Sequence, residues 1–312
     1  MQSNFKFADN FTKLFIGLAL VALVASCATV QQRAADLGPG FTQVKEGIYT
    51  FAPDATTTTC SFVVTNEGVV MIDACNSPLQ SRNMLAAIRK VTDKPILFLI
   101  NTETHGDHTG NNFIFSPPAR IINAEGAGAG MKKEYSPKRA ETFAAQSPEM
   151  REAVKGEKLI PPHIEYRDRM TLNVGERTFE LFYLKNVHSF ADTAVWMPKE
   201  RVLFAGSAAV VRILQNLRPA VVIADVLASY KLMKALNPEV VVTGHGPVTT
   251  TKTFDENEAF YALLLKRVGE MAAMGKSLVE IKKELKMPEY ADWNGQDRLG
   301  LYIDVAYKSV KK

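Results

Sequence analysis

The residues best suited to chemistry are gathered in one short segment, 101–112, which reads Asn-Thr-Glu-Thr-His-Gly-Asp-His-Thr-Gly-Asn-Asn. Within it, carboxylates and imidazoles alternate at close spacing, as Glu103, His105, Asp107 and His108. Each of these side chains can ligate a divalent metal through oxygen or nitrogen. A tight loop of this kind can divide its ligands between two neighbouring ions, and the ions would offset the repulsion between the close carboxylates. The segment therefore predicts a site for two metal ions.

Two of the other histidines, like this loop, come just after a predicted strand. The loop follows an apolar run at 96–100, His188 follows a predicted strand, and His245 follows a run of three valines. Because α/β folds place their sites beyond the carboxyl ends of strands, we expect His188 and His245 to meet the loop. The fifth histidine, His163, has no partner at a metal-ligand spacing. We interpret it as a loop residue, with substrate contact as the alternative.

Apolar runs and helical periodicity locate the elements that must hold these residues in place. In the first half, strands are predicted at 41–51, 60–65, 69–73 and 95–101, with a helix at 79–91. In the second half, strands are predicted at 170–174, 178–184, 194–197, 201–205 and 239–243, with a helix at 225–236. Strand-rich halves that alternate with helices predict an α/β fold in which helices cover the sheets.

Two further segments are predicted to be helical. Residues 124–158 are rich in Ala, Lys, Glu and Met and should form peripheral helices. From Phe254 onward, apolar residues recur at helical spacing and predict two or three amphipathic helices that pack on the core.

Composition sets few limits on partners. The 312 residues are 46% hydrophobic and 22% charged, with a formal net charge of +4, which is ordinary for a soluble globular protein. The sequence shows no basic run and no basic stripe with interleaved aromatics, so we expect no nucleic-acid partner. A chain of this length predicts one large domain with an appendage. Nothing in the sequence indicates the oligomeric state.

The N-terminus reads as a targeting signal. Lys6 and Lys13 precede a run of apolar and small residues at 14–25, which is too short to span a bilayer as a helix but has the length of a signal-peptide core. The run ends in Val-Ala-Ser-Cys at Cys27, which resembles the bacterial lipobox. The resemblance implies cleavage before Cys27 and lipidation of that cysteine.

We therefore expect a lipoprotein signal peptide at 1–26 and a polar tether at 27–40. The mature protein would be exported and held by its N-terminal lipid at the periplasmic face of a bacterial membrane. An ordinary signal peptide cut nearby, or a short buried helix, is the alternative.

Two cysteines remain, Cys60 and Cys75, on either side of a predicted hairpin that turns at Asn66-Glu67-Gly68. Export would let a disulfide persist, and counting outward from the turn puts the two cysteines nearly opposite each other. Directly opposed strand positions often have poor disulfide geometry. We therefore favour two small buried thiols over a disulfide.

The histidine loop resembles the His-x-His-x-Asp-His signature of the metallo-β-lactamase superfamily. The resemblance covers residues 41–250 and includes further motifs in the right order: Val70-Met71-Ile72-Asp73, His188, Leu203-Phe204-Ala205-Gly206-Ser207 and Gly244-His245-Gly246-Pro247. It implies an αβ/βα four-layer sandwich with metals in a groove at one edge of two sheets. Residues 251–312 would form a C-terminal helical extension.

Carried over by position, the resemblance implies two divalent metal ions, with Zn²⁺ expected and iron or manganese as alternatives. The first ion would be held by Glu103, His105 and His188, and the second by Asp107, His108 and His245. Glu103 stands where the family has its first histidine, which adds negative charge and oxygen character. Ser207 stands where the family usually has an aspartate that bridges both ions, so we expect the bridge to come from water or hydroxide alone.

This site predicts a metallohydrolase in which a metal-bound hydroxide attacks an ester, thioester, lactam or related bond of a small-molecule substrate. Asp107 would be the catalytic carboxylate that positions or receives the proton of the attacking water. Asp192 and Asp225 are candidate groups for orienting the metal histidines, with surface carboxylates as the alternative.

Three alternatives stay open. The first is a metallo-β-lactamase like those of subclass B3, which share the serine and the Asp-His-His second site. However, the segment after His188 reads Phe-Ala-Asp-Thr, where such lactamases tend to have Pro-Gly-Ser-Thr. The second is a non-catalytic binding lipoprotein, and the third is iron-dependent oxidation of a sulfur substrate.

Overall fold

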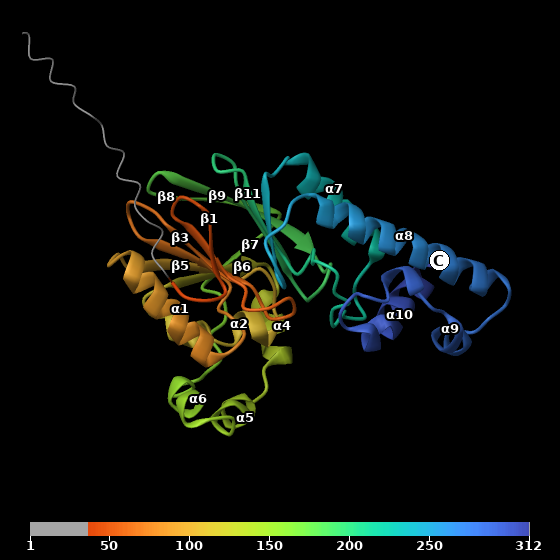
Figure 1. Ribbon diagram of the computed structural model, residues 1–312, viewed down its shortest axis with the longest axis horizontal. Helices are drawn as coiled ribbons and strands as arrows, with labels where there is room; N and C mark the ends of the chain where they lie inside the picture. The colour runs from red at the N-terminus through yellow and green to blue at the C-terminus, as the bar shows by residue number, and fades with distance from the viewer. Residues whose placement is uncertain (1–36, 312) are drawn as a thin grey trace, which may run out of the picture. The chain divides into compact units, whose positions relative to one another are not determined.

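The computed structural model describes residues 37–311, and these form two β-sheets with helices on their outer faces (Figure 1). The first sheet has the order β1-β2-β3-β4-β5-β6-β7. Its strands are Phe41–Lys45, Ile48–Phe51, Cys60–Val64, Val69–Ile72, Ile96–Ile100, Arg120–Ala124 and Ile164–Tyr166. The second sheet has the order β12-β11-β10-β9-β8. In chain order, these strands are β8 Arg169–Val174, β9 Arg177–Lys185, β10 Asp192–Met197, β11 Val202–Gly206 and β12 Val240–Thr243.

Three apolar clusters hold the layers together. One packs α1 (Pro78–Val91) against the outer face of the first sheet, and one fills the space between the two sheets. The third packs α7 (Ile223–Ala235) and the C-terminal helices onto the second sheet. Figure 1 shows α1 in orange beside the first sheet and α7 beside the second. The expected αβ/βα sandwich is therefore confirmed, because each sheet buries both of its faces.

The C-terminal helical extension is also present. It consists of α8 (Lys252–Ala273), α9 (Leu278–Glu284), the 3₁₀ turns Pro288–Tyr290 and Gln296–Arg298, and α10 (Leu299–Val310). Phe260 and Leu264 of α8 and Ile303 of α10 are buried in the same cluster as the second sheet. The predicted helical segment at 124–158 is formed by α4 (Ala127–Glu134), α5 (Arg139–Ala144) and α6 (Pro148–Ala153).

The strand predictions need two corrections. The segment 41–51 is a hairpin of β1 and β2 instead of one strand, because the chain reverses at Glu46-Gly47, where Gly47 has φ +69°. Strands β6 and β7 were not predicted. Strand β7 is only three residues long, and both strands pair with neighbours that are distant in sequence, β6 with β5 and β7 with β6.

The expectation of two free thiols was wrong, because Cys60 and Cys75 form a disulfide. Cys75 lies beyond β4, which ends at Ile72, and has a left-handed φ of +61°. The two cysteines are therefore not directly opposed positions of a regular ladder, which was the premise of the prediction. Their Cα atoms are 5.1 Å apart, well within the range that a disulfide spans.

The N-terminal predictions concern residues that the structure does not describe. The predicted signal peptide and the lipidation site Cys27 lie outside the described residues. Within the described part of the chain, no helix combines the length and apolar character needed to cross a membrane.

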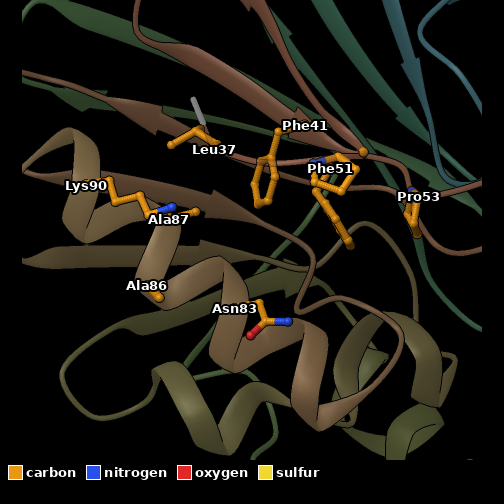
Figure 2. Close-up of a pocket in the computed structure, with 10 residues that line it drawn as sticks. Leu37, Phe41, Phe51, Pro53, Asn83, Ala86, Ala87 and Lys90 are labelled. Carbon is orange, nitrogen blue, oxygen red and sulfur yellow. The ribbon is translucent and has the colours of Figure 1, made fainter. Parts of the chain in front are cut away.

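A hollow of about 480 Å³ lies between α1 and the β1–β2 hairpin (Figure 2). Phe41 and Phe51 form one wall with ring centroids 4.8 Å apart, and Ala87 and Lys90 of α1 line the other side. The residues that line it include none of the predicted metal ligands. This hollow is therefore separate from the candidate site.

Candidate metal centre

The metal-ligand loop runs from the end of β5 into the short helix α2 (Gly106–Thr109). Asn101 begins the loop, and its side-chain amide donates to the carbonyl of His108 at 3.3 Å and to Asn112 Oδ1 at 3.1 Å. The Thr109 hydroxyl donates to the carbonyl of His105 at 3.0 Å. These contacts close the loop on itself, so its carboxylates and imidazoles are held in one place.

The first predicted ligand group is brought together as expected. Glu103 Oε2 lies 2.5 Å from His105 Nδ1 and 3.7 Å from His188 Nε2. The two imidazole nitrogens are 3.1 Å apart. His188 arrives from the second sheet, where it follows β9, so the group joins the two sheets at one edge.

The second predicted group lies directly beside the first. His108 Nε2 and His245 Nε2 are 3.2 Å apart, and Asp107 Oδ2 lies 3.5 Å from each of them. His245 follows β12 of the second sheet. Glu103 approaches this group as well, because its Oε1 lies 2.9 Å from His108 Nε2. All six predicted ligands therefore converge on one place.

The chemistry of this donor set fits divalent metal ions. Among the described residues, Glu103 is fully buried, and neither of its carboxylate oxygens accepts a hydrogen bond of satisfactory geometry. His188 Nδ1 is buried without a partner as well. Buried charges in proteins are normally paired by hydrogen bonds or coordinate metals. Glu103, His105 and His188 offer ligand atoms within 4.8 Å of one another, and so do Glu103, His108 and His245.

The electrostatics of the site keep Glu103 and His188 in the forms that bind metal, whereas the pKa values of His105 and His108 are raised, because the nearby carboxylates outweigh the lowering effect of burial. Burial acts to raise the pKa of Glu103, but the imidazoles around it hold that pKa well below its ordinary value. Burial lowers the pKa of His188 to about 3, against the attraction of Glu103. At neutral pH the carboxylate is therefore ionised and the His188 imidazole is neutral, which are the forms that bind metal.

Asp73 fixes the orientation of His108. Its Oδ2 lies 2.9 Å from His108 Nδ1, and it accepts a hydrogen bond from the Thr102 hydroxyl at 2.6 Å. The Thr102 amide donates to the other carboxylate oxygen at 2.8 Å. From sequence alone, Asp73 is only the end of a strand motif, because nothing in its spacing shows that the chain turns toward the loop there. Its φ of +58° marks that turn.

Of the two aspartates proposed to orient histidines, Asp192 contacts His188 and Asp225 lies at the surface. Asp192 is buried and accepts hydrogen bonds from the His188 amide at 2.8 Å and the Ser189 hydroxyl at 2.7 Å. It therefore holds the backbone of His188 and not its ring. Burial raises the pKa of Asp192 to about 6. Asp225 forms a surface ion pair with Lys185 at 3.1 Å, so the surface alternative applies to it.

Two further histidine nitrogens contact groups that lie outside the sequence motifs. Glu134 of α4 lies 3.4 Å from His105 Nε2 and is paired with Arg218. The ring of His245 contacts the carbonyl of Thr56 through Nδ1 at 2.8 Å. No spacing in the sequence could identify these contacts, since they come from a peripheral helix and a loop far along the chain.

Of the two other predicted positions, one lies inside the site and the other lies outside it. Ser207 lies inside the site, with Oγ 3.4 Å from His108 Nε2. His163 accepts a hydrogen bond from the Ile121 amide at 3.0 Å through Nδ1 and is not among the residues that line the site cavity. Its environment agrees with the loop interpretation.

The two groups open into a polar cavity of about 720 Å³. On one side it is lined by predicted ligands of the two groups, including His105, Asp107 and His245. On the other side, the loop ahead of α10 contributes Asn294 and Arg298, so the C-terminal extension forms part of the cavity wall. A buried cluster of ligands beside a polar cavity of this size can bind a small molecule next to a metal ion.

Replacing Asp73 with Ala is expected to weaken metal binding at the second group. Without the carboxylate, His108 loses the contact that orients its ring, and such losses typically cost about 10- to 100-fold in metal affinity. Zinc titration against a competing chelator measures the change. The control is Asp225→Asn on the surface, and equal affinities for Asp73→Ala and the unsubstituted protein would contradict the assigned role.

Comparison with known proteins agrees with this geometry. The family model for the metallo-beta-lactamase superfamily matches residues 53–245, which is more than half of the chain. The chain belongs to the metallo-beta-lactamase superfamily. The matched range begins ahead of β3 and ends at His245, so it contains every candidate metal ligand of the superfamily site.

Two curated relatives are similar over part of the chain. "Metallo-beta-lactamase type 2" of Elizabethkingia meningoseptica is 26% identical over 145 residues, 46% of this chain and 49% of that protein. "2,4-dinitroanisole O-demethylase subunit alpha" of Nocardioides sp. (strain JS1661) is 26% identical over 179 residues, 57% of this chain and 49% of that protein. The match therefore spans about half the length of each relative.

Solved structures show the same fold. A stereoselective inverting sec-alkylsulfatase from Pseudomonas sp. has a TM-score of 0.67 at 15% identity, covering 86% of this chain and 50% of that chain. A metallo-beta-lactamase from Pontibacter korlensis has a TM-score of 0.54 at 17% identity, covering 70% of this chain and 95% of that chain. At such identities the likeness shows the fold alone.

Proposed function

We propose that the protein is a metal-dependent hydrolase with two divalent ions, most suitably Zn²⁺, held by the six converging ligands. The observation that carries the proposal is the buried carboxylate of Glu103, which lies 2.5 to 3.7 Å from three imidazoles and accepts no hydrogen bond of satisfactory geometry. Two divalent ions bound here would supply an activated water as nucleophile and a Lewis acid for the electrophilic oxygen of the substrate. The superfamily membership supports the same chemistry.

The chain's own residues would then hold the substrate and a proton. Asp107 lines the cavity, and its Oδ2 accepts a hydrogen bond from the Thr58 hydroxyl at 2.6 Å. Burial acts to raise the pKa of Asp107, but His108 and His245 hold it below its ordinary value. The carboxylate is therefore ionised at neutral pH and suited to receive a proton from the attacking water.

The substrate would be a small molecule with a hydrolysable polar bond, such as an ester, thioester, lactam or sulfate ester. The cavity offers polar walls from several parts of the chain, including Thr57, Asn294 and Arg298. A panel of nitrocefin, a nitrophenyl ester, an acyl thioester and a nitrophenyl sulfate tests the bond class. Metal-dependent turnover of one class identifies it, whereas no turnover of any by the metal-loaded protein would favour a binding protein.

We further propose that the protein is exported and anchored to a bacterial membrane by a lipid on Cys27. The lysines and apolar run ahead of Cys27 support this, as does the disulfide, since disulfides persist mainly in oxidising compartments. Cys27→Ser is expected to abolish incorporation of a labelled fatty acid in a bacterial host and to release the protein from membranes. Retention of the label in Cys27→Ser would refute the anchor.

A further inference from the structure

Among the residues that the structure describes, Glu103 is shared by both candidate ligand groups. Its two carboxylate oxygens are divided between them. Oε2 lies 2.5 Å from His105 Nδ1 in the first group, and Oε1 lies 2.9 Å from His108 Nε2 in the second. We infer that Glu103 bridges the two metal ions, with one oxygen to each. The inference rests on the proposed two-metal function and replaces the expectation that water alone makes the bridge.

Burial supports a role for both oxygens. The Glu103 side chain has no exposed surface, and neither oxygen accepts a hydrogen bond of satisfactory geometry. If the carboxylate served the first group alone, Oε1 would face His108 Nε2 at 2.9 Å, and that nitrogen cannot donate to it once it ligates the second ion. An unpaired buried polar atom is costly, and more so when it carries charge. A bridging position satisfies both oxygens at once.

The surroundings of Ser207 support the same assignment. Ser207 stands where relatives usually have a bridging aspartate, and its Oγ lies 3.4 Å from His108 Nε2. A neutral hydroxyl supplies neither the negative charge nor the second oxygen of that aspartate. Glu103, which belongs to the same loop as His108, approaches the same His108 nitrogen to 2.9 Å. The two departures from the family pattern therefore compensate each other, because a bridging carboxylate is lost at 207 and gained at 103.

A bridging Glu103 would give the two groups different numbers of protein ligands. The second group would gain a fourth protein donor, Glu103, beside Asp107, His108 and His245. The first group would keep three, namely Glu103, His105 and His188. Four protein ligands are typical of tightly held structural ions, whereas three leave a position for water or substrate. Water and substrate would then bind at the first group.

The test isolates the second group. In a His105→Ala/His188→Ala background the first group is lost, and Co²⁺ then binds at the second group alone. Chelator competition measures its affinity, and the visible absorption spectrum of Co²⁺ reports the number and type of its ligands. Adding Glu103→Gln is expected to lower the affinity about tenfold or more and to change the spectrum. The matched control is Glu134→Gln, whose carboxylate contacts the first group and which should change neither.

The results of this experiment show whether Glu103 ligates the ion of the second group or only attracts it by its charge. An unchanged spectrum with Glu103→Gln overturns the bridge, even if the affinity falls, because a nearby charge attracts a cation without ligating it. Should the variants fold poorly, a crystal structure of the zinc-loaded, unsubstituted protein decides instead. It should place one Glu103 oxygen about 2.0–2.2 Å from each ion, and both oxygens on one ion would refute the inference. No bound ion at all would instead refute the proposed function.

Discussion

Removing one histidine from each ligand group, as His105→Ala together with His245→Ala, is expected to empty the first group, weaken the second and abolish hydrolysis. The first group would keep two donors, fewer than the three protein ligands that catalytic sites normally need, and the second would keep a single imidazole beside its carboxylates. Loss of the activated water would lower kcat/KM by about 10⁴-fold or more, more than the 10²- to 10⁴-fold that acid–base catalysis alone contributes. Elemental analysis and the best substrate of the panel measure both effects.

The matched control is His163→Ala, which removes a histidine outside the site cavity. It should bind two ions and keep its activity. If the double variant retained turnover while its metal content fell to zero, the reaction would not depend on the ions. Such a result would contradict the proposed chemistry, whereas equal loss in the control would indicate a general folding defect.

Replacing both cysteines of the disulfide, as Cys60→Ala together with Cys75→Ala, is expected to destabilise the fold by about 3 kcal/mol. The bond closes a loop with a sequence separation of 15 residues, and loops of this length are stabilised by roughly that amount through restriction of the unfolded chain. Urea denaturation of the oxidised protein and the double variant measures the difference. A difference below about 1 kcal/mol would show that the disulfide contributes little.

The disulfide should also affect the metal site. The residue before Cys75, Ala74, donates from its amide to the carbonyl of His108 at 2.8 Å, and Asn111 donates to the carbonyl of Cys75 at 2.7 Å. The segment that Cys75 anchors therefore also carries Asp73, which orients His108. We expect the double variant to bind zinc more weakly as well. The control is the unsubstituted protein after reduction, which should show the same two losses.

Most of the fold could be predicted because its pattern is local. The helix at α1 follows from apolar periodicity, and its start at Ser77 is fixed by a capping box with Gln80. Strands such as β5 and β12 are continuous apolar runs that suit burial on both faces. Strands β6 and β7 could not be predicted, because their strand conformation depends on pairing with neighbours that are distant in sequence.

The convergence of the candidate ligands could be predicted because their residue types are scarce and stand at strand ends. Five histidines in the chain make the positions of His188 and His245 informative. The contacts that support the ligands were harder to predict. Glu134 and Thr56 approach the site from a peripheral helix and a loop, and neither has a sequence spacing that relates it to the ligand loop.

The division of Glu103 between the two groups could not be predicted either. Sequence position assigned Glu103 to the first ion by analogy with a histidine, and an imidazole offers one nitrogen to a metal in that role. A carboxylate has two oxygens, and only the structure shows that they face different histidines. The side-chain geometry therefore adds a role that residue type and order do not contain.

The most direct test of the central claim is the metal content of the purified, unsubstituted protein, measured by elemental analysis after zinc loading and removal of free ions. The account predicts two zinc ions per chain, because six ligand side chains converge as two adjacent groups around Glu103. A chain that retains no metal under these conditions would contradict it, and the buried carboxylate and imidazoles would then be an ion-paired cluster without catalytic function.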